Sequence, residues 1–158
     1  MSNENENEGQ RTPVRKPSKR RRNRVAAMQF LYLYESNRDE MLEGLLISFF
    51  EAQEKPREYF EFTEELIHGT IGHIDEIDDR IESLAKNWKI DRIARGGPAI
   101  LRMACFELLY RSDIPPVVSI NEAIDLGKEY SNKESRRFLN GILDRMSGEL
   151  NRPLREAE

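Results

Sequence analysis

Apolar residues recur at the spacing of amphipathic helices along most of this chain, and no convincing stretch alternates apolar and polar residues as a strand does. Two stripes follow the spacing i, i+3, i+4, i+7 most clearly: Leu42, Leu45, Leu46, Phe49 and Phe50, and Phe138, Leu139, Ile142, Leu143, Met146 and Leu150. The pattern predicts an all-α fold of about seven helices in two small packed helical lobes.

Breaks in this periodicity predict the domain boundaries. Residues 1–17 are rich in Asn and Glu, contain two prolines and show no apolar period, which predicts a disordered leader. Gly96-Gly97-Pro98 interrupts the pattern again, with Pro98 suited to a first helical position. We therefore expect an N-terminal lobe over 18–88, a C-terminal lobe over 89–152 and a tail over 153–158.

Local signals refine the predicted helices. After Pro56, isoleucines and Trp88 spaced by seven predict one long helix, in which Gly69 and Gly72 mark a kink or a close helix contact. The segment 98–110 is apolar nearly all round and predicts a buried central helix whose charged Arg102 and Glu107 point outward. The segments 119–122 and 131–134 match the capping-box pattern and predict two further helix starts.

Several functional classes are disfavoured by composition. Cys105 is the single cysteine, so we expect no internal disulfide, no multi-cysteine zinc site and a reducing compartment. No apolar run approaches the ~20 residues of a membrane span, and no secretory signal pattern is present, which predicts a cytoplasmic protein. Neither a phosphate-cradling glycine loop nor a catalytic triad signature is present. We therefore expect no catalysis and no cofactor.

The two histidines give little reason to expect a metal. Glu65 and His68 have the Glu-x-x-His spacing of di-iron bundles, but such sites need a second pair. His73 has no Glu three residues before it. Solvent-facing polar residues are the better interpretation.

A basic segment points to a polyanionic partner. Residues 1–24 carry eight basic and three acidic side chains, whereas residues 25–158 carry 17 basic and 26 acidic. The run Lys19, Arg20, Arg21, Arg22, Asn23, Arg24 opens the first predicted helix, where cations face the positive end of the helix dipole. Bound phosphates would offset that repulsion, so we favour nucleic acid. A solubilising tail and a nuclear-localisation patch remain alternatives.

A second group combines aromatic and basic residues. Tyr130 and Phe138 flank Lys133, Arg136 and Arg137, and such groupings stack unpaired bases while binding phosphates. The helical spacing of Phe138 by itself favours the alternative that its ring belongs to the core.

Four motifs in the C-terminal half resemble the NusB family of transcription antitermination factors: Ala99–Leu109, Asp113-Ile-Pro, Val118–Leu126 and Phe138–Asp144. The first predicted helix matches in register through its arginines and through Ala27, Gln29, Leu31 and Tyr32. The resemblance covers residues 18–147 and implies a two-lobed helical fold. It also implies binding of single-stranded boxA RNA from ribosomal RNA operons together with the small-subunit ribosomal protein NusE, in a complex that lets RNA polymerase pass terminators.

The resemblance also assigns expected contacts. The residues implied to bind RNA are Arg20, Arg21, Arg22, Arg24, Tyr130, Arg137 and Phe138. We expect Lys19 of the same basic run and Gln29 of the same helix to join them. Those implied to meet NusE are Tyr32, Asp91 and Arg102, although Gly96-Gly97-Pro98 replaces charged residues of some members.

Two other functions stay open from the sequence. The chain could be a homo-oligomeric helical interaction protein whose basic arm is only a tail, and both a monomer and a homodimer are compatible with the sequence. It could also resemble the RNA-binding module of an RNA methyltransferase, but we expect no cofactor-binding half after Glu158.

Overall fold

The computed structural model describes residues 17–85, 90, 93 and 96–157. Within them, the chain forms seven α-helices and one short 3-10 helix, η1, which confirms the predicted all-α fold. Their bounds are α1 Lys19–Glu35, α2 Leu42–Glu51, η1 Arg57–Phe60, α3 Glu61–Gly72, α4 Ile74–Leu84, α5 Gly97–Tyr110, α6 Pro116–Tyr130 and α7 Lys133–Glu149. The expected leader lies outside the described residues except for Pro17. No helix in the described part is long and apolar enough to span a bilayer.

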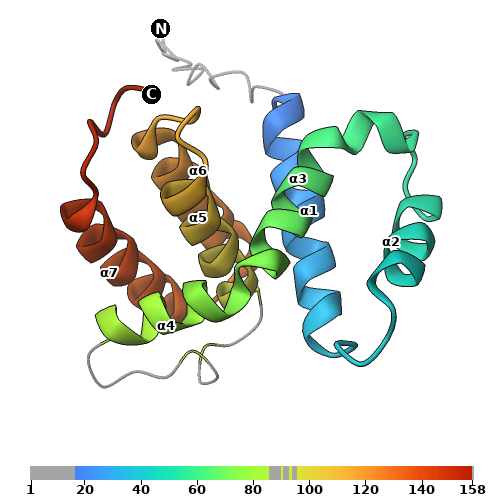
Figure 1. The fold of residues 1–158 in the computed structure, drawn as a ribbon, viewed down its shortest axis with the longest axis horizontal. Coiled ribbons are helices and arrows are strands. Elements are labelled where there is room, and N and C mark those ends of the chain that lie inside the picture. The colour runs from blue at the N-terminus through green and yellow to red at the C-terminus, as the bar shows by residue number, and fades with distance from the viewer. Residues whose placement is uncertain (1–16, 86–89, 91–92, 94–95, 158) are drawn as a thin grey trace, which may run out of the picture.

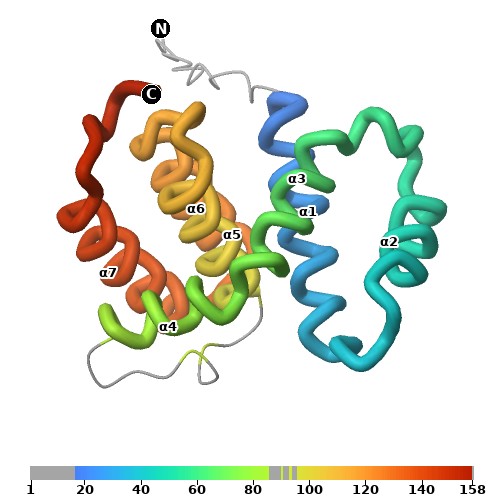
Figure 2. The backbone as a smooth tube through the Cα atoms, viewed as in Figure 1, coloured from blue at the N-terminus to red at the C-terminus, as the bar shows by residue number. Residues whose placement is uncertain are grey.

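The helices are arranged around α5 (Figures 1 and 2). On one side of it lie α1 and α3, which pack against each other, with α2 at the outer edge against α1. On the other side lie α6 and α7. Helix α4 precedes α5 in the sequence but packs against α5 and α7. Helix α5 therefore joins the two groups of helices into one core.

Side chains of α5 face neighbours in every direction, as its all-round apolar sequence predicts. Ile100, Leu101 and Cys105 are fully buried. The expectation that Arg102 and Glu107 point outward was wrong, because these residues are only 9% and 1% exposed. A helix enclosed by α1, α3, α4, α6 and α7 has little surface left for water. Both charges are instead neutralised by partners from other helices.

The predicted long helix after Pro56 is in fact three elements, η1, α3 and α4. Its break lies at His73, whose φ of −117° and ψ of 19° are not helical. The bend lets α3 pack on α1 while α4 reaches α7. Gly69 makes the close contact that was predicted, since an added Cβ would lie 1.9 Å from the Phe106 ring. Gly72 has no atom within 4 Å of such a Cβ.

Helix starts depend on caps that the sequence identified only in part. Ser18 caps α1 by accepting a hydrogen bond from the Arg21 amide at 3.1 Å. The predicted cap at Ser119 was wrong: α6 begins at Pro116, and Ser119 lies inside the helix. The second cap is Asn132 rather than Ser131, because its Oδ1 accepts from the Ser135 amide at 2.8 Å. A proline at the first helical position needs no partner for an amide hydrogen, so α6 can begin at Pro116, three residues before Ser119.

Candidate nucleic-acid interface

Helix α1 distributes the basic run over three different environments. Lys19, Arg20 and Arg22 are exposed, Arg21 is half-buried and Arg24 is buried. This separation follows from the helical period, because one edge of α1 packs against α3 and α5 while the opposite edge faces water. The run predicted from the sequence is therefore not one uniform phosphate-binding strip.

Arg24 points into the interior and does not belong to the exposed surface. Its NH2 lies 2.7 Å from Glu107 Oε1 and its Nε lies 3.1 Å from Glu107 Oε2. Only 3% of the residue is exposed. The buried Glu107 carboxylate occupies the guanidinium, so the expected contact of Arg24 with RNA would require this ion pair to open.

Arg21 connects α1 to α6. Its Nε donates to Glu122 Oε2 at 2.9 Å and its NH2 donates to Asp125 Oδ2 at 2.7 Å. Hydrogen bonds to these two carboxylates raise the pKa of the guanidinium further above its ordinary value. Arg21 thus holds the middle of α6 beside α1, and a phosphate would have to compete with two carboxylates for it.

A groove of about 540 Å³ runs between α1, the segment before α3 and the end of α6. Three expected RNA-binding side chains line it together, namely Arg22, Gln29 and Tyr130. In the described part of the chain, Arg22 has no hydrogen bond or ion pair to another side chain. Glu54 and Glu129 also line the groove, so its electrostatic character is mixed rather than uniformly positive.

A second groove, of about 450 Å³, continues from the first along α1. Gln29 and Tyr130 line both, and Tyr32 is added at the far side. Burial raises the pKa of Tyr130, and the negative charge of the neighbouring Glu129 raises it further. The hydroxyl therefore stays protonated at neutral pH and can donate a hydrogen bond. An amide, a phenol and a guanidinium therefore lie within one continuous concave surface.

Gly96 lets Tyr130 approach α1. A Cβ at this position would lie 3.1 Å from the Tyr130 carbonyl oxygen and 3.2 Å from Met28 Sδ. The φ of −70° is ordinary, so lack of space rather than backbone conformation favours glycine here. The glycine that departs from the pattern of some family members thus shapes the second groove.

The predicted group on α7 does not join this surface. Phe138 is 7% exposed and belongs to the core, so the expected stacking of its ring on RNA would require the ring to leave the core. Arg137 is exposed on α7 but does not line either groove. The helical spacing of Phe138 predicts its buried position correctly.

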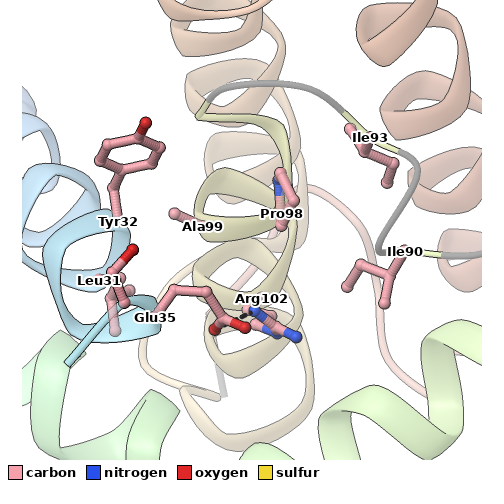
Figure 3. Close-up of a pocket in the computed structure, with 9 residues that line it drawn as sticks. Leu31, Tyr32, Glu35, Ile90, Ile93, Pro98, Ala99 and Arg102 are labelled. Carbon is pink, nitrogen blue, oxygen red and sulfur yellow. Dashed lines mark hydrogen bonds and ion pairs between the residues drawn. The ribbon is translucent and has the colours of Figure 1, made fainter. Parts of the chain in front are cut away.

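A separate cleft of about 360 Å³ lies between α1 and α5, as Figure 3 shows. Tyr32 and Glu35 of α1 face Pro98, Ala99 and Arg102 of α5, with Ile90 and Ile93 at the other side. Tyr32 is 59% exposed. Of the residues expected to meet a partner, the cleft brings Tyr32 and Arg102 together, and Asp91 lies outside the described residues.

Arg102 is held at the base of this cleft by two carboxylates. Its Nε donates to Asp78 Oδ1 at 2.8 Å and its NH1 donates to Glu35 Oε2 at 2.9 Å. Burial alone would raise the pKa of Glu35, but hydrogen bonds and charge from Arg38 and Arg102 lower it overall. The carboxylate therefore stays ionised, and Arg102 shapes the cleft while little of it is exposed.

Other candidate chemistry has a structural explanation. Glu65 accepts a hydrogen bond from Arg111 NH1 at 2.9 Å rather than pairing with His68. Within the described ranges, no three His, Cys, Asp or Glu side chains gather as metal ligands would. Burial raises the pKa of the Cys105 thiol far above its ordinary value, so it does not form the reactive thiolate.

Lys55 and Tyr59 also line the first groove, and no sequence motif singles them out. They lie in the segment between α2 and α3, where no apolar period distinguishes inward from outward positions. The sequence signal that could have identified them is the spacing of Tyr59 four positions after Lys55, and such a spacing is only weakly indicative of a binding site.

The sequence profile of the NusB family matches residues 21–148. Transcription antitermination protein NusB of Myxococcus xanthus is 43% identical over 137 residues, covering 85% of this chain and 98% of that protein. The protein of the same name from Thermodesulfovibrio yellowstonii is 42% identical, with 83% and 93% covered.

Solved structures of NusB proteins are similar to this chain as well. The structure of NusB from T. maritima has a TM-score of 0.71 at 36% identity, covering 86% of this chain and 94% of that one. A structure of antitermination factors NusB and NusE in complex with dsRNA has a TM-score of 0.71 at 27% identity, with 84% and 98% covered.

Proposed function

The chain belongs to the NusB family of transcription antitermination proteins, and from this premise we propose that it binds boxA-type RNA along the two grooves beside α1, together with the ribosomal protein NusE. It acts as a binding protein rather than an enzyme. The RNA is the transcript of a ribosomal RNA operon, and the complex assembles on RNA polymerase in the cytoplasm.

The observation that carries this proposal is the meeting of Arg22, Gln29 and Tyr130 in one groove. An arginine side chain without a carboxylate partner can bind a phosphate, an amide can bond a base edge, and a phenol ring can stack on a base. Glu54 and Glu129 repel phosphates from part of the groove. We therefore place the RNA backbone near Arg22 and a base near Tyr130.

We propose that the bound RNA is single-stranded where it crosses the groove. A ring such as Tyr130 stacks only on a base that is not already paired and stacked within a helix. The related NusB and NusE structure contains dsRNA, which is consistent with contact to RNA of more than one form. Lys19 and Arg20, both exposed, add attraction without base selectivity.

We propose that NusE occupies the cleft between α1 and α5. The cleft has an apolar wall, and Tyr32 leaves 59% of its surface for a partner. Tyr32 also lines the second groove. A partner in the cleft would therefore touch RNA in the neighbouring groove, and the two ligands should bind more tightly together than separately.

Fluorescence anisotropy of a labelled boxA-like RNA, with and without NusE, tests the proposal. Arg22→Ala should weaken binding and lower the slope of log K against log salt by about 0.7, the value for one phosphate contact on a single strand. Arg155→Ala removes the same charge from the exposed segment after α7 and serves as the matched control. Equal affinities and slopes for the two variants would contradict the proposal.

A further inference from the structure

The aromatic ring of Tyr59 is approached by two lysines from different parts of the chain. Lys19 Nζ, from the first turn of α1, lies 5.1 Å from the ring centroid. Lys55 Nζ, from the loop after α2, lies 5.8 Å from it. Only the folded structure brings these three residues together, since Lys19 is far from the other two in the sequence.

Neither lysine has a carboxylate partner among the residues that the structure describes. Elsewhere, exposed and half-exposed arginines pair with carboxylates, as Arg38 does with Glu35 and Arg111 with Asp113. Two unpaired ammonium groups beside one ring create a local excess of positive charge. Such a site favours an anion that also offers a flat apolar face.

A buried network of hydrogen bonds holds the backbone of Tyr59 in place. Its carbonyl oxygen accepts a hydrogen bond from Asn23 Nδ2 at 3.2 Å. The other side of that amide, Asn23 Oδ1, accepts from the Thr63 amide at 3.0 Å and from its hydroxyl at 2.8 Å. Asn23 is 1% exposed and Thr63 is fully buried. The backbone that carries the ring is therefore already ordered before a ligand binds.

Tyr59 also lies where two concave surfaces meet. It lines the groove that contains Arg22 and Tyr130, and it lines a further groove of about 350 Å³ with Lys19, Arg20 and Phe62. In that further groove the Arg20 guanidinium covers the Phe62 ring, 3.9 Å from its centroid. A strand leaving the first groove past the start of α1 would meet Tyr59 next.

We propose that Lys19, Lys55 and Tyr59 form an additional nucleotide subsite for single-stranded RNA, an inference that rests on the proposed function. One unpaired base stacks on the Tyr59 ring, and the lysines move from the ring to the adjacent phosphates, as their flexible stems allow. Glu54 and Glu61 line the grooves on the two sides. Their carboxylates limit how closely neighbouring phosphates can approach on either side of the subsite.

The test measures the affinity of the full chain for a boxA-like RNA with flanking unpaired nucleotides. Tyr59→Leu should weaken binding about tenfold, within the range found for one stacked base. Tyr59→Phe keeps the ring and should bind within about twofold of wild type. Lys55→Gln should lower the salt slope by about 0.7, as for one lost phosphate contact. Lys128→Gln, on an exposed part of α6, is the charge-matched control.

Crosslinking supplies an independent readout. An RNA carrying 4-thiouridine at successive positions should crosslink to the peptide that contains Tyr59 from one position only, as detected by mass spectrometry. Thermal melts of each variant show whether the fold is retained, and Tyr59→Phe reports on the ring if Tyr59→Leu fails to fold. Affinity lost equally in Tyr59→Phe and Tyr59→Leu would overturn the stacking role.

The outcomes separate this subsite from the proposed function. If Arg22→Ala weakens RNA binding while Tyr59→Leu and Lys55→Gln bind as wild type does, with no crosslink at Tyr59, the subsite is refuted and the function stands. If the wild-type protein binds no RNA with or without NusE, the proposed function itself fails.

Discussion

Arg24 of α1 and Glu107 of α5 form an ion pair in the protein interior, with 2.7 Å between Arg24 NH2 and Glu107 Oε1. The same carboxylate accepts a hydrogen bond from Ser119 Oγ of α6 at 3.0 Å. Three helices therefore meet at one buried acid. The pair fixes how α1 rotates relative to α5 and α6, and hence which side chains of α1 reach the grooves.

Breaking this pair should strongly destabilise the fold. Arg24→Met leaves Glu107 buried without its counter-charge, which typically costs about 3–5 kcal/mol. The double variant Arg24→Met with Glu107→Leu should be less destabilised than Arg24→Met alone, because no unpaired charge remains. Urea unfolding followed by circular dichroism measures both. A double variant that is no more stable than the single one would show that the charge is not the cause.

Gly69 should not tolerate a side chain. Gly69→Ala places a methyl group 1.9 Å from the Phe106 ring and forces α3 and α5 apart, at a cost of about 1–3 kcal/mol. Gly44→Ala in α2 is the control, since nothing lies within 4 Å of its added Cβ. The control should be unchanged or more stable by up to about 1 kcal/mol. Equal melting temperatures for the two variants would argue against the close contact.

Tyr32 should contribute to NusE affinity without supporting the fold. Tyr32→Ala removes a ring that is 59% exposed, and loss of an interface tyrosine of this kind commonly costs about 2 kcal/mol of binding free energy. Leu33→Ala, next to it and 41% exposed, does not line the cleft and is the matched control. Isothermal titration calorimetry should show that Tyr32→Ala binds NusE with lower affinity and that Leu33→Ala binds it with the affinity of wild type.

Stability should fall in acid partly through Asp113. The hydrogen bond from Arg111 lowers the pKa of the Asp113 carboxyl below its ordinary value. A carboxyl with a depressed pKa in the folded state stabilises the protein above its unfolded pKa of about 4, and this contribution is lost as the pH falls through the folded-state pKa. Asp113→Asn should therefore show a shallower loss of melting temperature below about pH 4 than wild type. Parallel curves would exclude a contribution from this carboxyl.

The helices themselves could be predicted because the information is local. The stripe at Leu42 to Phe50 repeats at the helical period, which any helix must satisfy to bury one face, and the segment 98–110 is apolar nearly all round, as an enclosed helix is. Family motifs such as Phe138–Asp144 likewise lie within single helices. The break at His73 could not be predicted from the local pattern. The bend is required only by tertiary packing, which places α3 against α1 and α4 against α7.

Which charges are available for RNA was decided by tertiary structure. Arg22 and Arg24 are two residues apart in one basic run, but two steps along an α-helix turn a side chain by about 200°. One therefore faces the groove and the other faces Glu107. The sequence determined that a basic helix would form. Only the packing of α1 against α3 and α5, which buries one edge of that helix, determined the residues that remain open to a ligand.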